Sequence, residues 1–187
     1  EENIAARMQQ ENGRYAYDML EDELKPLYVE LLMIVEQHGE DVKISVADSD
    51  VLQYVFQCMF NDHPEIYWID GYAYTRHMQN GQIAYLTFSG KYLYTQEETR
   101  TLQVQIDQYV SQCFSGLAMN ASEYEKVRHV YEYLIEHTDY NIQARDNQNI
   151  LSVFLYGESV CQGYAKATQY LLERLDVSCT MVVGKVS

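Results

Sequence analysis

Residues 157–167 constrain the fold most, because they place one cysteine in the first turn of a predicted helix lined with small residues. Ser159 and Gln162 have the Ser-x-x-Gln spacing of a capping box, which predicts a helix that begins just after Ser159. Cys161 then lies beside the unpaired N–H groups and the positive dipole end of this helix. Those partial charges favour a thiolate, so the position suits a cysteine nucleophile. The simpler interpretation is a small apolar residue at a helix start.

The sequence around this cysteine has a wider pattern. Ser-Val-Cys-Gln-Gly-Tyr-Ala-Lys-Ala at 159–167 is followed by an apolar stretch at 177–183 that predicts a short strand ending at Gly184. Together these segments resemble the nucleophile segment of transglutaminase-like proteins, which have a papain-like core. Residues 131–141 resemble the helix that leads into the same core. The resemblance covers roughly residues 121–184, with looser similarity back to residues 61–65.

The resemblance implies an α+β fold in two parts. Residues 1–119 are expected to form a mostly helical N-terminal region with a β-hairpin at 66–94. Residues 120–187 are expected to form the N-terminal half of a transglutaminase-like core, with the cysteine helix and its first strand. The family places a His and then an Asp on strands downstream of the cysteine helix, and the sequence ends at Ser187. The chain therefore resembles the front part of such a protein, truncated before its last strands.

Five histidines lie upstream of the cysteine, and none follows it. His129 and His137 fall on one predicted helix, and His137 is followed by Asp139, which could orient an imidazole. Because triads are defined by geometry and not by chain order, either ring is a candidate partner of Cys161. The ordinary interpretation is that all five are solvated or packed; they are His38, His63, His77, His129 and His137.

Two functions from different classes follow. In the first, the resemblance implies an enzyme in which Cys161 attacks a carboxamide or peptide carbonyl of a protein or peptide substrate and forms a thioester. Water or an amine then resolves the thioester, with the Cys161 backbone N–H as oxyanion donor. Without the downstream His and Asp, this fragment is expected to be nearly inactive. The alternative is a non-catalytic binding or assembly module that keeps the scaffold.

Composition argues against several other classes of function. With 47% apolar and 22% charged residues the chain has the balance of a folded globular protein. Its net charge of −15 makes nucleic acid a poor partner, because phosphate binding needs clusters of Lys and Arg. No apolar run is long enough to span a membrane. Neither a Cys-x-x-Cys pair nor a calcium-loop pattern occurs, so no metal or cofactor is expected.

The four cysteines do not decide whether the protein resides in a reducing or an oxidising compartment. Cys58 and Cys113 lie on apolar helix faces and are expected to be buried thiols, or a disulfide if the protein is secreted. By resemblance, an acidic protein of this kind is a secreted or envelope-attached bacterial protein. The strand at residues 180–183 would expose an unpaired edge, which predicts a homodimer through that edge.

Local signals predict the remaining elements. Pro26 divides a helical pattern at 3–37, so that one helix ends near Leu20 and another begins near Asp22. A nearly apolar helix is predicted at 51–60, after a short strand at 41–46 and a cap at Asp48 or Ser49. Asn-Gly at 80–81 predicts the turn of a tyrosine-rich hairpin, whose rings either stabilise the sheet or bind a glycan or peptide. Capping boxes at 95–98 and 122–125 begin two more helices, and 150–156 is predicted to be a short helix or turn.

Overall fold

A computed structural model describes residues 2–182 and 184, and it confirms a mixed α+β fold. The chain separates into two compact units, Glu1–Gln96 (unit 1) and Glu97–Ser187 (unit 2). Each unit has its own hydrophobic core.

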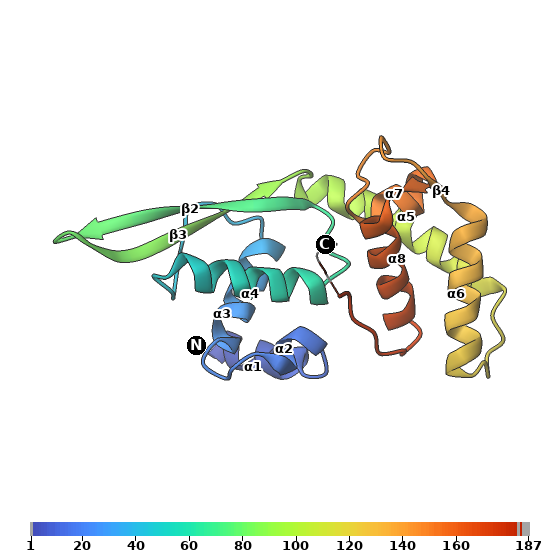
Figure 1. Ribbon diagram of the computed structural model, residues 1–187, viewed down its shortest axis with the longest axis horizontal. Coiled ribbons are helices and arrows are strands. Elements are labelled where there is room, and N and C mark those ends of the chain that lie inside the picture. The colour runs from blue at the N-terminus through green and yellow to red at the C-terminus, as the bar shows by residue number, and fades with distance from the viewer. Residues whose placement is uncertain (1, 183, 185–187) are drawn as a thin grey trace. The chain divides into compact units, whose positions relative to one another are not determined.

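Unit 1 is built from helices around a long antiparallel hairpin, which Figure 1 shows in blue to green. Its helices are α1 (Glu2–Glu11), α2 (Tyr15–Met19), α3 (Lys25–Glu36) and α4 (Ser49–Asp62). Its strands are β1 (Val42–Ile44), β2 (Ile69–Gln79) and β3 (Gln82–Tyr92), in the sheet order β1-β3-β2. The predicted turn at Asn80 and Gly81 is confirmed, with φ angles of 52° and 77°.

Aromatic side chains join α4 to the sheet. The Phe56 ring lies 4.5 Å from that of Tyr72 and 5.9 Å from that of Phe88, so the hairpin tyrosine nearest α4 belongs to the core. The predicted cap of α4 is confirmed, because the Asp48 carboxylate accepts from the Asp50 and Val51 N–H groups. Pro26 stands in the first turn of α3, as predicted. One break was missed: the first helix stops at Glu11 and a new one begins at Tyr15, with Gly13 at φ 96° between them.

Unit 2 packs four helices against one another and adds a small parallel sheet. Its helices are α5 (Gln96–Ser115), α6 (Glu123–His137), α7 (Ile150–Tyr156) and α8 (Cys161–Glu173), and its strands are β4 (Asp139–Tyr140) and β5 (Glu158–Ser159). The capping box that begins α6 is confirmed in both directions between Ser122 and Glu125. On α6, Val130 and Leu134 are buried, whereas Val127 and Tyr131 are exposed.

The structural division falls at residue 96, and not near residue 119 where the sequence places it. The reason is that α5 packs within unit 2. The Tyr109 ring of α5 lies 4.7 Å from Phe154 of α7, and Gln103 donates to the Tyr170 hydroxyl of α8 at 3.1 Å. On α6, His129 lies 2.7 Å from the Cys113 carbonyl of α5.

The strand predicted after the cysteine helix is not formed in the described residues. Residues 177–182 are irregular, and Val183 lies outside the described residues. A strand needs hydrogen bonds from a neighbour, and the described part of the chain pairs none with this stretch. The strand edge on which the expected dimer depends is therefore not seen in the structure.

Candidate active site at the start of α8

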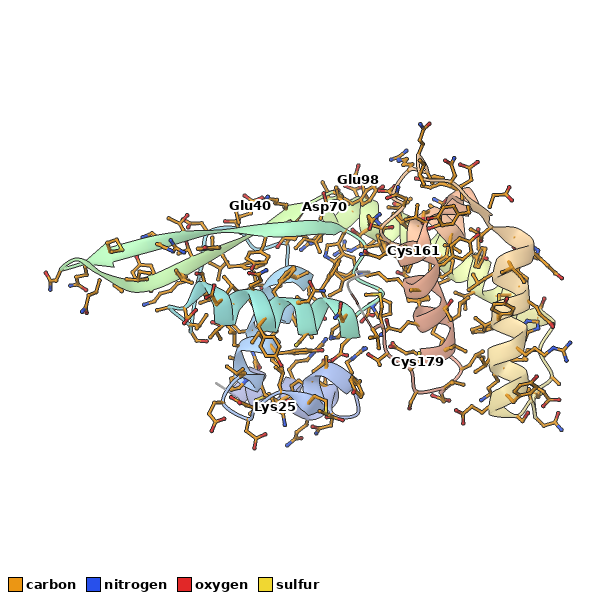
Figure 2. All side chains as sticks on the ribbon, viewed as in Figure 1. Lys25, Glu40, Asp70, Glu98, Cys161 and Cys179 are labelled. Atoms are coloured by element: carbon orange, nitrogen blue, oxygen red, sulfur yellow. The ribbon has the colours of Figure 1, made fainter. Side chains whose placement is uncertain are left out.

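Cys161 is the first residue of α8 and its side chain is exposed. Figure 2 shows it at the end of α8 opposite to the Cys179 end. Val160 is the N-cap residue and supplies no side-chain cap, and the first intrahelical bond runs from the Tyr164 N–H to the Val160 carbonyl at 3.1 Å. The N–H groups of residues 161–163 therefore precede the helical hydrogen-bond ladder and stand at the thiol.

The predicted capping box at Ser159 is wrong. Ser159 lies in β5, fully buried, and its hydroxyl is 2.7 Å from that of Ser152, which donates to the Asn149 carbonyl. The strand directs this side chain into unit 2, where its hydroxyl lies against the first turn of α8 and bonds to Ser152 and to the Asn147 and Val160 carbonyls. Sequence alone predicted the helix start correctly but assigned Ser159 the wrong role.

Gly163 lets α8 approach this serine pair closely, as the small residues of the motif suggest. A Cβ at position 163 would lie 2.0 Å from the Ser159 hydroxyl oxygen, 2.7 Å from that of Ser152 and 2.9 Å from the Asn147 carbonyl oxygen. No side chain fits in this space. The glycine therefore holds the first turn of α8 against β5 and α7.

A second attachment fixes β4 beside the same helix turn. β4 and β5 pair in parallel, with Asp139 opposite Glu158 and Tyr140 opposite Ser159. The Asp139 N–H donates to the Gly157 carbonyl at 2.8 Å, and the hydroxyl of Tyr164, on α8, donates to the Thr138 carbonyl. Figure 1 shows β4 at the end of unit 2 where α8 begins.

The histidines that the sequence raised as partners of Cys161 are engaged elsewhere. His129 contacts the Cys113 carbonyl, and His137 lies 2.8 Å from the Tyr133 carbonyl and stacks on the Tyr133 ring at 4.0 Å. Within residues 2–182, no hydrogen bond joins Cys161 to a histidine. The described structure thus holds the candidate nucleophile without a bonded base.

The other three cysteines differ from Cys161 in burial. All four are free thiols, including Cys58 of unit 1 and Cys113 of unit 2, for which the sequence left a disulfide open. Burial raises the pKa of the Cys113 thiol to about 11, and burial together with the Glu173 carboxylate does the same for Cys179. Burial also raises the pKa of Cys58, against the effect of a hydrogen bond with Tyr54. These three thiols are suppressed nucleophiles.

Two classes of site find no support in the described part of the chain. Its His, Cys, Asp and Glu side chains form no group of three that could hold a metal ion. No helix there is both long enough and apolar enough to cross a bilayer.

Comparison with known families now identifies the region around Cys161. Residues 110–187 match the family model of the transglutaminase-like superfamily. The match begins within α5 and includes the rest of unit 2, so this part of the chain is transglutaminase-like. No curated protein matches the chain.

The segment between α6 and α7 contributes to the surroundings of Cys161, and the sequence did not indicate this. In residues 138–149, Thr138 attaches the segment to α8 and Asn141 attaches it to β5. The available signal was the alternation of Tyr140 and Ile142 with polar residues, which is typical of a strand.

Proposed function

We propose that Cys161 is the nucleophile of a transglutaminase-like acyl-transfer site that acts on a carboxamide or peptide bond of a protein or peptide. One observation carries the proposal: within the family-matched region, the cysteine of the Cys-x-Gly-Tyr-Ala motif is exposed at the uncapped start of a 13-residue helix. N–H groups at such a helix start stabilise negative charge on a sulfur and on a carbonyl oxygen.

The chemistry follows from this placement. The sulfur attacks the carbonyl carbon, the C–N bond breaks, and the amine leaves with a proton, which gives a thioester. Attack by water or by a second amine releases the product and restores the thiol. The Cys161 N–H is the proposed oxyanion donor. Because no base is bonded to Cys161 in the described residues, we propose that the chain as it stands forms covalent adducts but turns over very slowly.

Selective alkylation tests the nucleophile. Treated with limiting iodoacetamide at neutral pH, the folded chain is expected to be labelled at Cys161 before its other three cysteines. Exposure alone would also favour Cys161, so its rate in the folded chain is compared with its rate in urea. The helix start is expected to make the folded rate about two- to fivefold higher. Peptide mass spectrometry gives the rate at each cysteine.

Two results would contradict the assignment. The first is labelling of Cys161 no faster than that of Cys58, Cys113 and Cys179. The second is a folded rate below the rate in urea, which would show that the fold protects this thiol. Either result would favour the alternative of a non-catalytic binding or assembly module.

A further inference from the structure

We propose that residues 139–142, here called the β4 lip, bind the protein segment that carries the attacked carbonyl, and that they select a large apolar side chain next to a basic residue. This inference rests on the function proposed for Cys161. It adds a substrate class that neither the family match nor the motif supplies.

The first support is rigidity. The β4 lip is held by bonds to β5 and to the following loop. Asn141 donates from its N–H to the Ser159 carbonyl at 2.9 Å and from its side chain to the Glu158 carboxylate at 2.7 Å. The Asn147 side chain donates to the Ile142 carbonyl at 3.0 Å. A surface fixed before binding loses little conformational entropy when a ligand arrives.

The second support is the apolar surface that this rigid segment exposes. Tyr140 and Ile142 are 65% and 72% exposed, and they alternate with the bonded residues Asp139 and Asn141. Two large apolar side chains held in water by a fixed backbone are a cost to the free protein, and burial by a ligand removes that cost. The Asp139 and Asn141 N–H groups face β5, so the Tyr140 peptide group faces the opposite edge, where an extended segment can pair.

The third support is position. Tyr140 lies opposite Ser159 in the parallel register, and Ser159 is two residues before Cys161. Tyr164, one turn after Cys161, donates to the Thr138 carbonyl at the beginning of the lip. The first turn of α8 therefore carries the thiol and also bonds to Thr138, the residue before the lip, so the thiol and the lip lie at the same end of α8.

The preference for a basic residue in the bound segment follows from the charges near the lip. Asp139 and Glu158 are register partners, and both are exposed. The nearby cation, Arg145, is paired with Asp146 and stacked on the Tyr156 ring. Two carboxylates at the lip attract a basic residue and repel an acidic one.

Three chloroacetyl dipeptide amides test the lip: Phe-Arg, Phe-Glu and Gly-Arg. Each labels a thiol as its C–Cl bond is exchanged for a C–S bond. With rates divided by the iodoacetamide rate, Phe-Arg is expected to label Cys161 about tenfold faster than Gly-Arg. It is expected to be a few-fold faster than Phe-Glu at low salt, with the difference reduced in high salt.

The chain offers a matched control for the lip. The variant Y140A/I142A is expected to bring the Phe-Arg and Gly-Arg rates within about twofold of each other. The variant Y131A/I135A removes the same two side chains from α6, where they are 62% and 53% exposed, and is expected to keep the full preference. In Y131A/I135A the iodoacetamide rate at Cys161 should stay unchanged, and in both variants Cys113 should stay protected, which shows that unit 2 is folded.

The outcomes separate the two proposals. Slow iodoacetamide labelling of Cys161 in the unaltered chain overturns the proposed nucleophile. Fast iodoacetamide labelling with equal rates for the three dipeptides overturns the lip alone. A dipeptide preference that survives in Y140A/I142A also overturns it.

Discussion

Replacement of Gly163 by alanine is expected to destabilise unit 2 by about 3 kcal/mol. In an ordinary helix this change stabilises by up to about 1 kcal/mol, because alanine is the better helix former. Here the new methyl group would lie 2.0 Å from the Ser159 oxygen and 2.9 Å from the Asn147 backbone carbonyl oxygen, and both serines are fully buried. The sign of the effect therefore distinguishes close packing from helix propensity.

The measurement uses a thiol that only unit 2 can protect. Cys113 is fully buried in unit 2, so brief alkylation along a urea series reports the unfolding of that unit. A loss of 3 kcal/mol raises the open fraction of Cys113 more than about 100-fold. The single tryptophan, Trp68, belongs to unit 1, and the midpoint of its fluorescence transition is expected to stay where it is.

Two further variants check the cause. Gly116→Ala adds a methyl group that meets only the His129 ring at 3.1 Å, and it is expected to cost far less. The double variant G163A/S159A removes the nearest clashing oxygen and is expected to recover part of the loss. If Gly163→Ala stabilises unit 2, or if Gly116→Ala costs as much, then close packing at Gly163 is not the reason for the glycine.

Sequence reasoning predicted elements whose signals are local. The turn at Asn80 and Gly81, the caps at Asp48 and Ser122 and the exposed cysteine at a helix start each depend on a few adjacent residues. Their physical cause lies within one turn of chain, so they can be read from composition and spacing. The transglutaminase-like resemblance around Cys161 is confirmed for the same reason, because its motif is contiguous.

Features that depend on distant partners were missed or misassigned. Ser159 has the correct spacing for a cap, but the hydroxyl of Ser152 and the β4 pairing draw it inward. Residues 180–182 have strand composition, yet no described strand pairs with them. Hydrophobic and turn patterns give the type of an element, whereas partners from elsewhere in the fold determine what its side chains contact.

A cluster of charged side chains in unit 1, formed by Glu11, Arg14, His63 and Glu65, joins two segments that are far apart in the sequence. His63 is 1% exposed and lies between two carboxylates, 3.2 Å from Glu11 and 2.7 Å from Glu65. Arg14 lies 3.1 Å from Glu11 and 3.4 Å from Glu65. Next to His63 in the chain, the Asp62 carboxylate accepts hydrogen bonds from the N–H groups of residues 16 and 17, in the first turn of α2. It also accepts one from the Tyr28 hydroxyl. Glu11 and Arg14 look like solvated residues in the sequence, because His63 and Glu65 lie about 50 positions further along the chain.

Replacement of His63 by glutamine is expected to destabilise unit 1 by about 2 kcal/mol, because the buried Glu11 carboxylate loses its imidazolium and keeps only its pairs with Arg7 and Arg14. Burial lowers the pKa of His63, but hydrogen bonds with Glu11 and Glu65 outweigh burial, so its pKa is raised above 6.5. Burial raises the pKa values of Glu11 and Glu65, and His63 and the arginines outweigh it, so both lie below 4.5.

These directions define the pH dependence. His63, whose pKa is raised in the folded state, contributes its full stability below pH 6.5. This stability is lost as the pH rises through its folded-state pKa. Glu11 and Glu65, whose pKa values are lowered in the folded state, contribute stability above pH 4.5. This stability is lost as the pH falls through their folded-state pKa values. The cluster is therefore most stabilising between pH 4.5 and 6.5, and unit 1 should weaken on the alkaline side of this window.

Urea midpoints of Trp68 fluorescence at pH 6 and pH 9 test this dependence. Midpoints are used in place of intensities because the His38 ring stacks on Trp68, with the ring centroids 6.0 Å apart, and such a neighbour affects the fluorescence intensity. The unaltered chain is expected to lose more stability from pH 6 to pH 9 than H63Q does. His77→Gln, which changes a ring stacked on Tyr85 at 4.3 Å, is expected to keep the full slope. An H63Q variant as steep as the unaltered chain would show that the imidazolium does not hold this cluster together.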